Sequence, residues 1–183
     1  MNELVADRYA RALLEIGMQK GNTDVYYRDL KYIGDHLNMY EPLRKAVEAP
    51  SVPSSVKKNI LIELFFKRVE KDVINTLCLI VDKERQQYID DIIRCYWKRL
   101  NELKNIIVAT VVTAVPAPAD MPAKLKATLT KQTGRQVEII MKEDPSIIGG
   151  IQIIVDDNIH DFSIRGRLDG LEKHMNNLPI GKF

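Results

Sequence analysis

Two groups of residues near the end of the chain have the types that phosphate-binding loops use. Gly149 and Gly150 form a pair, and Gly166 lies between Arg165 and Arg167. A phosphate loop needs a longer string, and the chain contains neither GxxxxGK[ST] nor a GxGxxG that follows a strand. Arg165 and Arg167 would also lie about 200° apart around a helix, which is poor geometry for a joint phosphate clamp. We therefore expect these glycines to allow tight turns and close backbone packing.

Other residue types that perform chemistry are present but scattered. The three histidines have neither HxxxH nor HExxH spacing, and Cys78 and Cys95 do not form a CxxC pair. The paired carboxylates Asp90–Asp91 and Asp156–Asp157 are expected on a solvated helix face and at a hairpin tip. No GxSxG string marks a serine nucleophile. The sequence thus predicts no catalytic site, no bound metal and no cofactor.

Length and charge restrict the class of protein further. The chain has 183 residues, enough for one medium domain or two small ones. Its 27 basic and 25 acidic residues give a formal net charge of +2, without the basic excess of a dedicated nucleic-acid binder. The first residues lack the apolar core of a signal peptide, and the apolar stretch from Ile106 is too short to span a bilayer. We expect a protein of a reducing compartment, cytoplasmic or attached to a membrane only through partners.

The secondary structure that must position these residues is predicted to change from helices to mainly strands near residue 105. Before it, apolar residues recur with a helical period, and glycine, proline and serine mark the ends of the helices. Six helices are expected, over residues 2–20, 23–37, 42–49, 51–68, 72–85 and 86–104. Thr23 is expected to cap the second of them. Since short helices need neighbours to cover their apolar stripes, residues 1–105 are predicted to form a six-helix bundle.

After residue 105 the pattern becomes strand-like, with many Val, Ile and Thr residues. The expected order is a strand, a helix capped by Asp120, three strands and a final helix capped by Ser163. Residues 106–183 therefore read as a small module of a mixed sheet and helices, with a hairpin across residues 156–158. The predicted fold class is α+β, with the N-terminal six-helix bundle followed by this C-terminal module.

Two helices of the predicted bundle have more apolar or small residues than one buried face requires. The first helix carries a second stripe of small residues, Ala6, Ala10, Leu13 and Gly17, and the fifth, from Val73 to Val81, is apolar nearly all round. Such a helix is either central in its bundle or covered by a partner. The alternative to internal packing is a surface groove between these two helices that receives an amphipathic helix.

Two motifs resemble those of a known family. ADRYARALLEIG, from Ala6 to Gly17, resembles the A-x-R-Y-A-x-A-L signature of the delta subunits of bacterial F-type ATP synthases, relatives of the mitochondrial oligomycin-sensitivity-conferring protein. DPSIIGGIQIIVDDNIHDFSIRGRLDGL, over residues 144–171, resembles their D-P-S-[LI]-I-G-G strand followed by D-x-S-[VI]-R-G-R-L. The likeness covers the whole chain in order. Two departures are Asp156–Asn158, which lacks the usual glycine, and Lys83–Glu84, which replaces an asparagine-glycine, so that the fifth helix is expected to continue further.

The resemblance implies a stator subunit without catalytic activity of its own. It implies that residues 1–105 bind the N-terminal helix of an alpha subunit, on top of the catalytic head, in the groove between the first and fifth helices. Residues 106–183 would engage the b subunits of the peripheral stalk, so that the alpha/beta ring is held still while the rotor turns. The resemblance further implies one copy per complex, a monomer when isolated, and a peripheral position on the cytoplasmic face of the cell membrane without insertion into it.

The resemblance also assigns residues to these roles. The implied partner-binding residues are Ala6, Tyr9, Ala10 and Leu13 on the first helix and Ile74, Leu77, Cys78 and Val81 on the fifth. Arg8 is expected either in a salt bridge within the bundle or in contact with the partner. The implied structural motif of the second module consists of Gly149, Gly150, Asp161, Ser163, Arg165, Gly166 and Arg167.

A different class of function stays open beside this one. A small nucleic-acid-binding protein would use the C-terminal module and its basic residues Lys124, Lys126, Lys131 and Arg135. Against this alternative, no predicted strand carries an aromatic pair of the kind that stacks on bases, and no GxxG loop joins two helices.

Overall fold

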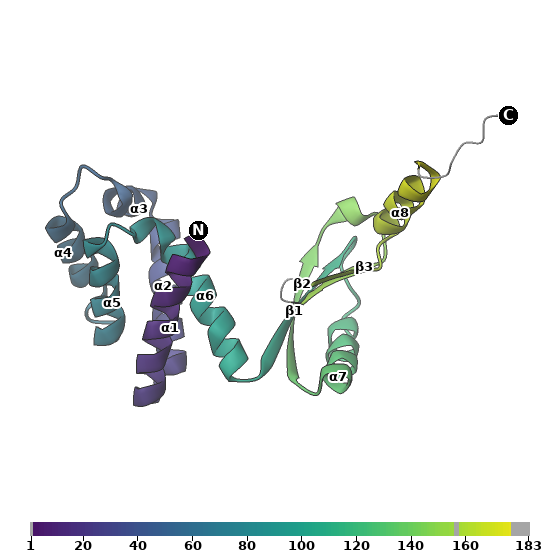
Figure 1. Ribbon diagram of the computed structural model, residues 1–183, viewed down its shortest axis with the longest axis horizontal. Coiled ribbons are helices and arrows are strands. Elements are labelled where there is room, and N and C mark those ends of the chain that lie inside the picture. The colour runs from purple at the N-terminus through teal and green to yellow at the C-terminus, as the bar shows by residue number, and fades with distance from the viewer. Residues whose placement is uncertain (1, 156–157, 177–183) are drawn as a thin grey trace. The chain divides into compact units, whose positions relative to one another are not determined.

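The computed structural model describes residues 2–155 and 158–176. Its chain divides into two compact units, Met1–Leu103 and Lys104–Phe183, next to the expected boundary at residue 105 (Figure 1). The first unit is helical, and the second is built on a four-stranded sheet. The fold class is therefore α+β.

The helical unit follows the periodicity of the sequence closely. Its elements are α1 (Asn2–Lys20), α2 (Thr23–Met39), α3 (Glu41–Glu48), α4 (Ser54–Phe65), α5 (Lys71–Asp82), the short 3-10 helix η1 (Gln86–Tyr88) and α6 (Ile89–Leu103). Gly21 ends α1 with a φ of +70°, a conformation that glycine adopts without strain. The expected cap at Thr23 is wrong, because Asn22 occupies the cap position and gives no side-chain cap bond, while Thr23 is the first helical residue.

The core of this unit is formed by one side of each long helix. Its largest fully buried side chains include Tyr26 and Ile33 from α2, Phe65 from α4 and Tyr96 from α6. Each large apolar side chain removed from water contributes roughly 1.5–3 kcal/mol. The hydroxyl of Tyr96 donates a hydrogen bond of 2.9 Å to the carbonyl of Thr23, so the one polar atom of this ring is satisfied inside the core.

The end of α5 differs from expectation, because the helix stops at Asp82 instead of continuing. Glu84 adopts a left-handed φ of +55°, and the N–H of Arg85 donates to the carbonyl of Ile80 over 2.9 Å. This is the hydrogen-bond pattern of a helix that ends in a left-handed residue, a position that usually holds glycine. The backbone thus makes the turn even though Glu84 has a side chain.

The C-terminal unit contains a mixed sheet with the strand order β2-β1-β3-β4. Its elements are β1 (Ile106–Thr113), α7 (Met121–Thr133), β2 (Gln136–Glu143), the 3-10 helix η2 (Pro145–Ile147), β3 (Ile151–Val155), β4 (Asn158–Asp161) and α8 (Ile164–Asn176). The central strand β1 pairs parallel with β2, across the α7 crossover, and antiparallel with β3. The β3–β4 pairing is antiparallel, and the expected carboxylate pair Asp156–Asp157 lies outside the described residues.

The sheet and α7 form the small core of this unit. Val111, Val137 and Ile153 are buried, and Leu125 and Leu129 of α7 pack against them. Asp120 occupies the cap position of α7, but the expected cap bond is not formed, because its carboxylate pairs with Lys124 at 2.5 Å. The last helix, α8, packs mainly on η2.

Candidate partner-binding surfaces

The residues expected to line a groove between α1 and α5 are mostly inside the helical unit. Ala6 and Ala10 are 0% exposed, and Leu13, Ile74, Leu77 and Val81 are also buried. The expectation that they line an open groove is wrong for this chain alone, because they pack against its own helices, and α1 packs most extensively on α6. Only Tyr9 and Cys78 of the eight keep partly accessible side chains.

The exposed seam between α1 and α5 is defined by contacts at its two ends. At one end Lys20 of α1 pairs with Asp72 of α5 at 2.5 Å. At the other end the Arg85 guanidinium lies 5.9 Å from the centre of the Tyr9 ring, and its Nη1 is 3.5 Å from the Tyr9 hydroxyl. The two helices therefore run antiparallel along this seam.

Apolar side chains are exposed between these two ends. Ile16 lies seven residues after Tyr9, and Leu79 seven residues after Asp72, so each shares a helix face with a seam contact. They are 36% and 48% exposed. We call Tyr9, Ile16 and Leu79 the α1–α5 seam. The exposure of Leu79 could have been predicted from the sequence, because its helix face also carries the polar residues Asp72, Asn75 and Asp82.

The Asp72 end of the seam is fixed by a buried tyrosine as well as by Lys20. The hydroxyl of Tyr26, which is fully buried, donates to the Asp72 carboxylate. The hydrogen bonds from Lys20 and Tyr26 lower the pKa of Asp72. Burial, and after it the neighbouring Asp72 carboxylate, raises the pKa of Tyr26. The ends of α1 and α5 are thus held together through an ionised carboxylate and a protonated phenol.

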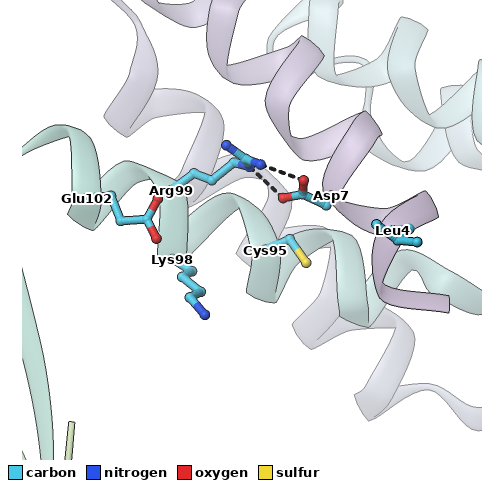
Figure 2. A pocket seen from close by; sticks show the side chains of 6 residues that line it. All are labelled: Leu4, Asp7, Cys95, Lys98, Arg99 and Glu102. Atoms are coloured by element: carbon cyan, nitrogen blue, oxygen red, sulfur yellow. Dashed lines mark hydrogen bonds and ion pairs between the residues drawn. The ribbon is translucent and has the colours of Figure 1, made fainter. Parts of the chain in front are cut away.

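On another side of α1, an ion pair connects it to α6. The guanidinium of Arg99 donates through Nε and Nη2 to the two carboxylate oxygens of Asp7, with both distances at 2.5 Å. This pair lowers the pKa of Asp7 and raises that of Arg99, in each case chiefly through the hydrogen bonds. Figure 2 shows the two side chains pointing toward each other in a pocket of about 340 Å³ that Leu4, Cys95, Lys98 and Glu102 also line. The arginine and the carboxylate satisfy each other, so this pocket offers neither of them to a ligand.

Arg8 does not form the expected salt bridge within the bundle. It is exposed on α1, and among the described residues no carboxylate pairs with it. The physical reason is its place on the helix, because the neighbouring Asp7, and not Arg8, faces α6.

In the second unit, the glycine and arginine motif forms the junction between β4 and α8. The Asp161 carboxylate accepts the backbone N–H of Ser163 at 2.8 Å, and Ser163 caps α8 by accepting the N–H of Gly166 at 3.0 Å. The hydrogen bonds from Ser163 lower the pKa of Asp161. A Cβ on Gly166 would come within 2.6 Å of the Asp161 carboxylate, so the glycine permits this close contact between α8 and the end of β4.

The paired glycines Gly149 and Gly150 pack closely against this junction. Gly150 has a φ of +80°, and a Cβ there would lie 2.4 Å from the carbonyl oxygen of Phe162. A Cβ on Gly149 would lie 2.8 Å from the Ile164 side chain. The exposed Arg165 donates to the carbonyl of Ser146 at 3.3 Å, while Arg167 is also exposed. The motif therefore joins two backbone segments, and its arginines do not converge on a shared anion site.

An exposed apolar surface surrounds the same junction. It consists of large side chains that are each about half exposed: Ile148, Phe162, Ile164, Leu168 and Leu171. We call this set the α8 surface. Ile148 is additionally held at a φ of +68°, in a tight turn closed by the hydrogen bond from Gly149 N–H to the Ile147 carbonyl. The sequence analysis did not identify this surface, although the spacing of Ile164, Leu168 and Leu171 places the three on one helix face.

The described residues contain no cluster of three or more His, Cys, Asp or Glu side chains suited to a metal ion. Within the same residues, no helix is both long and apolar enough to cross a membrane. The α1–α5 seam and the α8 surface are exposed apolar surfaces, a kind of surface that often marks a contact with another polypeptide.

Comparison with known proteins places the whole chain in one family. The family model described as ATP synthase delta (OSCP) subunit matches residues 5–175. ATP synthase subunit delta of Alkaliphilus oremlandii is 30% identical over 98% of this chain and 100% of its own length, and that of Halothermothrix orenii is 33% identical over 98% and 94%. A chain of the Toxoplasma gondii mitochondrial ATP synthase hexamer shares the fold, with a TM-score of 0.76 at 21% identity over 95% of this chain and 98% of that one. The chain belongs to the ATP synthase delta (OSCP) subunit family.

Proposed function

We propose that the protein is a non-catalytic stator subunit of a proton-translocating F-type ATP synthase. It links the alpha/beta catalytic head to the b-subunit peripheral stalk, so that the torque of the rotor is resisted. The observation that carries the proposal is the family match, which spans both units of the chain from residue 5 to residue 175. Each unit also has an exposed apolar surface of its own, as a linker between two partners requires.

On the side of the catalytic head, the α1–α5 seam is the proposed binding site for the N-terminal helix of an alpha subunit. An amphipathic helix laid along the seam would cover the exposed parts of Ile16 and Leu79, both of which are apolar. Tyr9 and Cys78 keep their proposed contact role, since both are partly accessible. The buried residues Ala6, Ala10, Leu13, Ile74, Leu77 and Val81 support this surface from below. Arg8, which is exposed and has no ion-pair partner among the described residues, is available to an acidic residue of the docked alpha-subunit helix.

On the side of the stalk, the α8 surface is the proposed contact for the b subunits. Its five apolar side chains are half exposed, and α8 packs mainly on the short η2 segment, so a partner helix could cover much of its apolar stripe. The glycine junction supports this role indirectly, because it fixes Phe162 and Ile164 relative to Ile148. The protein is a peripheral part of the membrane-bound complex, and its proposed position is the cytoplasmic face of the cell membrane.

Reconstitution tests the function. Membrane vesicles whose synthase lacks this subunit should hydrolyse ATP without pumping protons, and adding the full chain should restore pumping. Leu168→Glu should weaken restoration by about tenfold or more in protein concentration, since it places a charge on the α8 surface, whereas Leu168→Met should restore as wild type does. The equivalent pair for the seam is Leu79→Lys, which should weaken restoration, and Leu79→Met, which should restore pumping as wild type does. Full pumping without the added chain would refute the stator role.

The nucleic-acid-binding alternative has no support in the structure. Lys124, one of the four basic residues on which it depends, is already paired with Asp120. The relatives found are ATP synthase subunits.

A further inference from the structure

An aromatic pocket lies on the helical unit, built from elements other than α1 and α5. It has a volume of about 600 Å³, within the range of pockets that bind small molecules. Six of its lining side chains come from α2, α3, α4 and the loops that follow α2 and α4: Tyr32, His36, Tyr40, Leu43, Leu64 and Arg68. Because the seam and the α8 surface include none of these residues, the pocket is separate from the proposed stator contacts.

Ring contacts hold the wall of this pocket in place. Tyr32 and His36 each meet the buried ring of Phe65 edge to face, with ring centres 6.0 Å apart. His36 Nδ1 lies 2.8 Å from the carbonyl of Tyr32, and its ring centre is 4.0 Å from that of Tyr32. Tyr40, beside His36 with ring centres 6.3 Å apart, is 55% exposed at the rim. The wall is thus made of positioned rings, and flat apolar groups pack well against such rings.

One cation at the pocket is not neutralised. Arg68 Nη1 donates to the Tyr32 hydroxyl over 3.1 Å, and among the described residues no carboxylate pairs with its guanidinium. A guanidinium has five N–H donors, so several remain available. A neighbouring hollow of about 310 Å³ is lined by Tyr32 and Arg68 and adds Arg28 and Asp29. The Asp29 carboxylate there pairs with Arg28 at 3.8 Å and accepts the N–H of Glu70 at 2.8 Å, so the positive charge of Arg68 is the one that no carboxylate among the described residues balances.

We propose that this pocket binds a small amphiphile that combines a flat aromatic ring system with one negative charge. The rings lie against Tyr32, His36 and Leu64, and the anionic group accepts hydrogen bonds from Arg68. A cationic ligand is disfavoured, although aromatic rings attract cations, because Arg68 would repel it. A hydrogen bond to a charged group contributes enough to change affinity by about tenfold or more.

Two probes that differ only in an anionic sulfonate group test this proposal on the full chain. One is 1-anilinonaphthalene-8-sulfonate, and the other is the neutral N-phenyl-1-naphthylamine, which has the same rings without the sulfonate. Fluorescence titration should show a preference of about tenfold for the sulfonate. Chemical shifts in the NMR spectrum should change at Tyr32, His36 and Tyr40 at the same concentrations.

Matched variants identify the source of the preference. Arg68→Gln should abolish the preference for the sulfonate. Arg8→Gln, at another exposed arginine that pairs with no carboxylate among the residues the structure describes, should leave the preference unchanged. Leu64→Glu should abolish binding at this pocket, and Val56→Glu, at an exposed position of the same helix, should not. Thermal melts followed by circular dichroism verify that all four variants fold. Equal affinity for the two probes, or shift changes confined to the α8 surface, would overturn the proposal.

Discussion

Gly150→Ala should destabilise the C-terminal unit far more than a single methyl group ordinarily does. The left-handed φ of +80° costs an L-residue about 1–2 kcal/mol. The new Cβ would also lie 2.4 Å from the Phe162 carbonyl oxygen, so one of the two backbone segments must move. Movement strains the hydrogen bonds from Phe162 N–H to Ile151 and from Ile164 N–H to Gly149, which are 3.0 and 2.9 Å long. At about 1 kcal/mol for each bond, the total cost is about 3–4 kcal/mol.

Variants at two other glycines distinguish the cost of the left-handed φ from the cost of the close contact with the Phe162 carbonyl. Gly134 also has a left-handed φ, of +66°, but a Cβ there meets nothing within 4 Å, so Gly134→Ala should cost only about 1–2 kcal/mol. Gly170 lies within α8 with open space around it, and Gly170→Ala should stabilise by about 0.5–1 kcal/mol. Native-state hydrogen exchange of the β3 amides measures the opening free energy of this unit for each variant. If Gly150→Ala costs no more than Gly134→Ala, the close approach of the Phe162 carbonyl is not the constraint inferred here.

Three further substitutions and one control test the helical unit. Ala10→Arg should unfold it, since the fully buried site has no room for a long charged side chain, and Ala12→Arg on the exposed side of α1 should melt like wild type by circular dichroism. Glu84→Gly should raise the free energy of unfolding in urea by about 0.5–1 kcal/mol, because it relieves a left-handed φ at the end of α5, and a loss of stability would contradict this account. Asp72 has a lowered pKa, so its stabilising contribution is present above the ordinary carboxyl pKa of 3.8 and is lost as the pH falls further. Acid unfolding of Asp72→Asn should therefore be less steep than that of wild type in that range, and identical slopes would show that this carboxylate contributes little.

Much of the fold could be predicted from the sequence, because periodicity reports which side of an element is buried. The change from helices to strands near residue 105 follows from the Val- and Ile-rich run that begins at Ile106. The position of β1 between β2 and β3 could not be predicted in this way, since strand order depends on which long-range pairings close, not on local pattern. The end of α5 was missed for a different reason: Glu84 carries no local sign that it will adopt a conformation typical of glycine.

The proposed partner-binding surfaces were harder to predict than the fold. Small residues such as Ala6 and Ala10 allow a helix to approach closely, but they do not say whether that helix belongs to the same chain. Here α6 is the helix that packs most extensively on α1. The accessible seam instead carries Ile16 and Leu79, whose exposure depends on how α1 and α5 lie side by side. The α8 surface was missed as a surface because an apolar helix stripe ordinarily marks burial within its own unit.

The central place of β1 in its sheet has a mechanical consequence for a protein that resists torque. The chain passes from the end of α6 at Leu103 almost directly into Ile106, and β1 is bonded to β2 on one side and β3 on the other. A pull transmitted through residues 104–105 therefore reaches the strand that has a hydrogen-bonded neighbour on each side, and the load passes into two ladders of hydrogen bonds. A strand at the edge of the sheet has one such ladder, so the same load would act on fewer hydrogen bonds there.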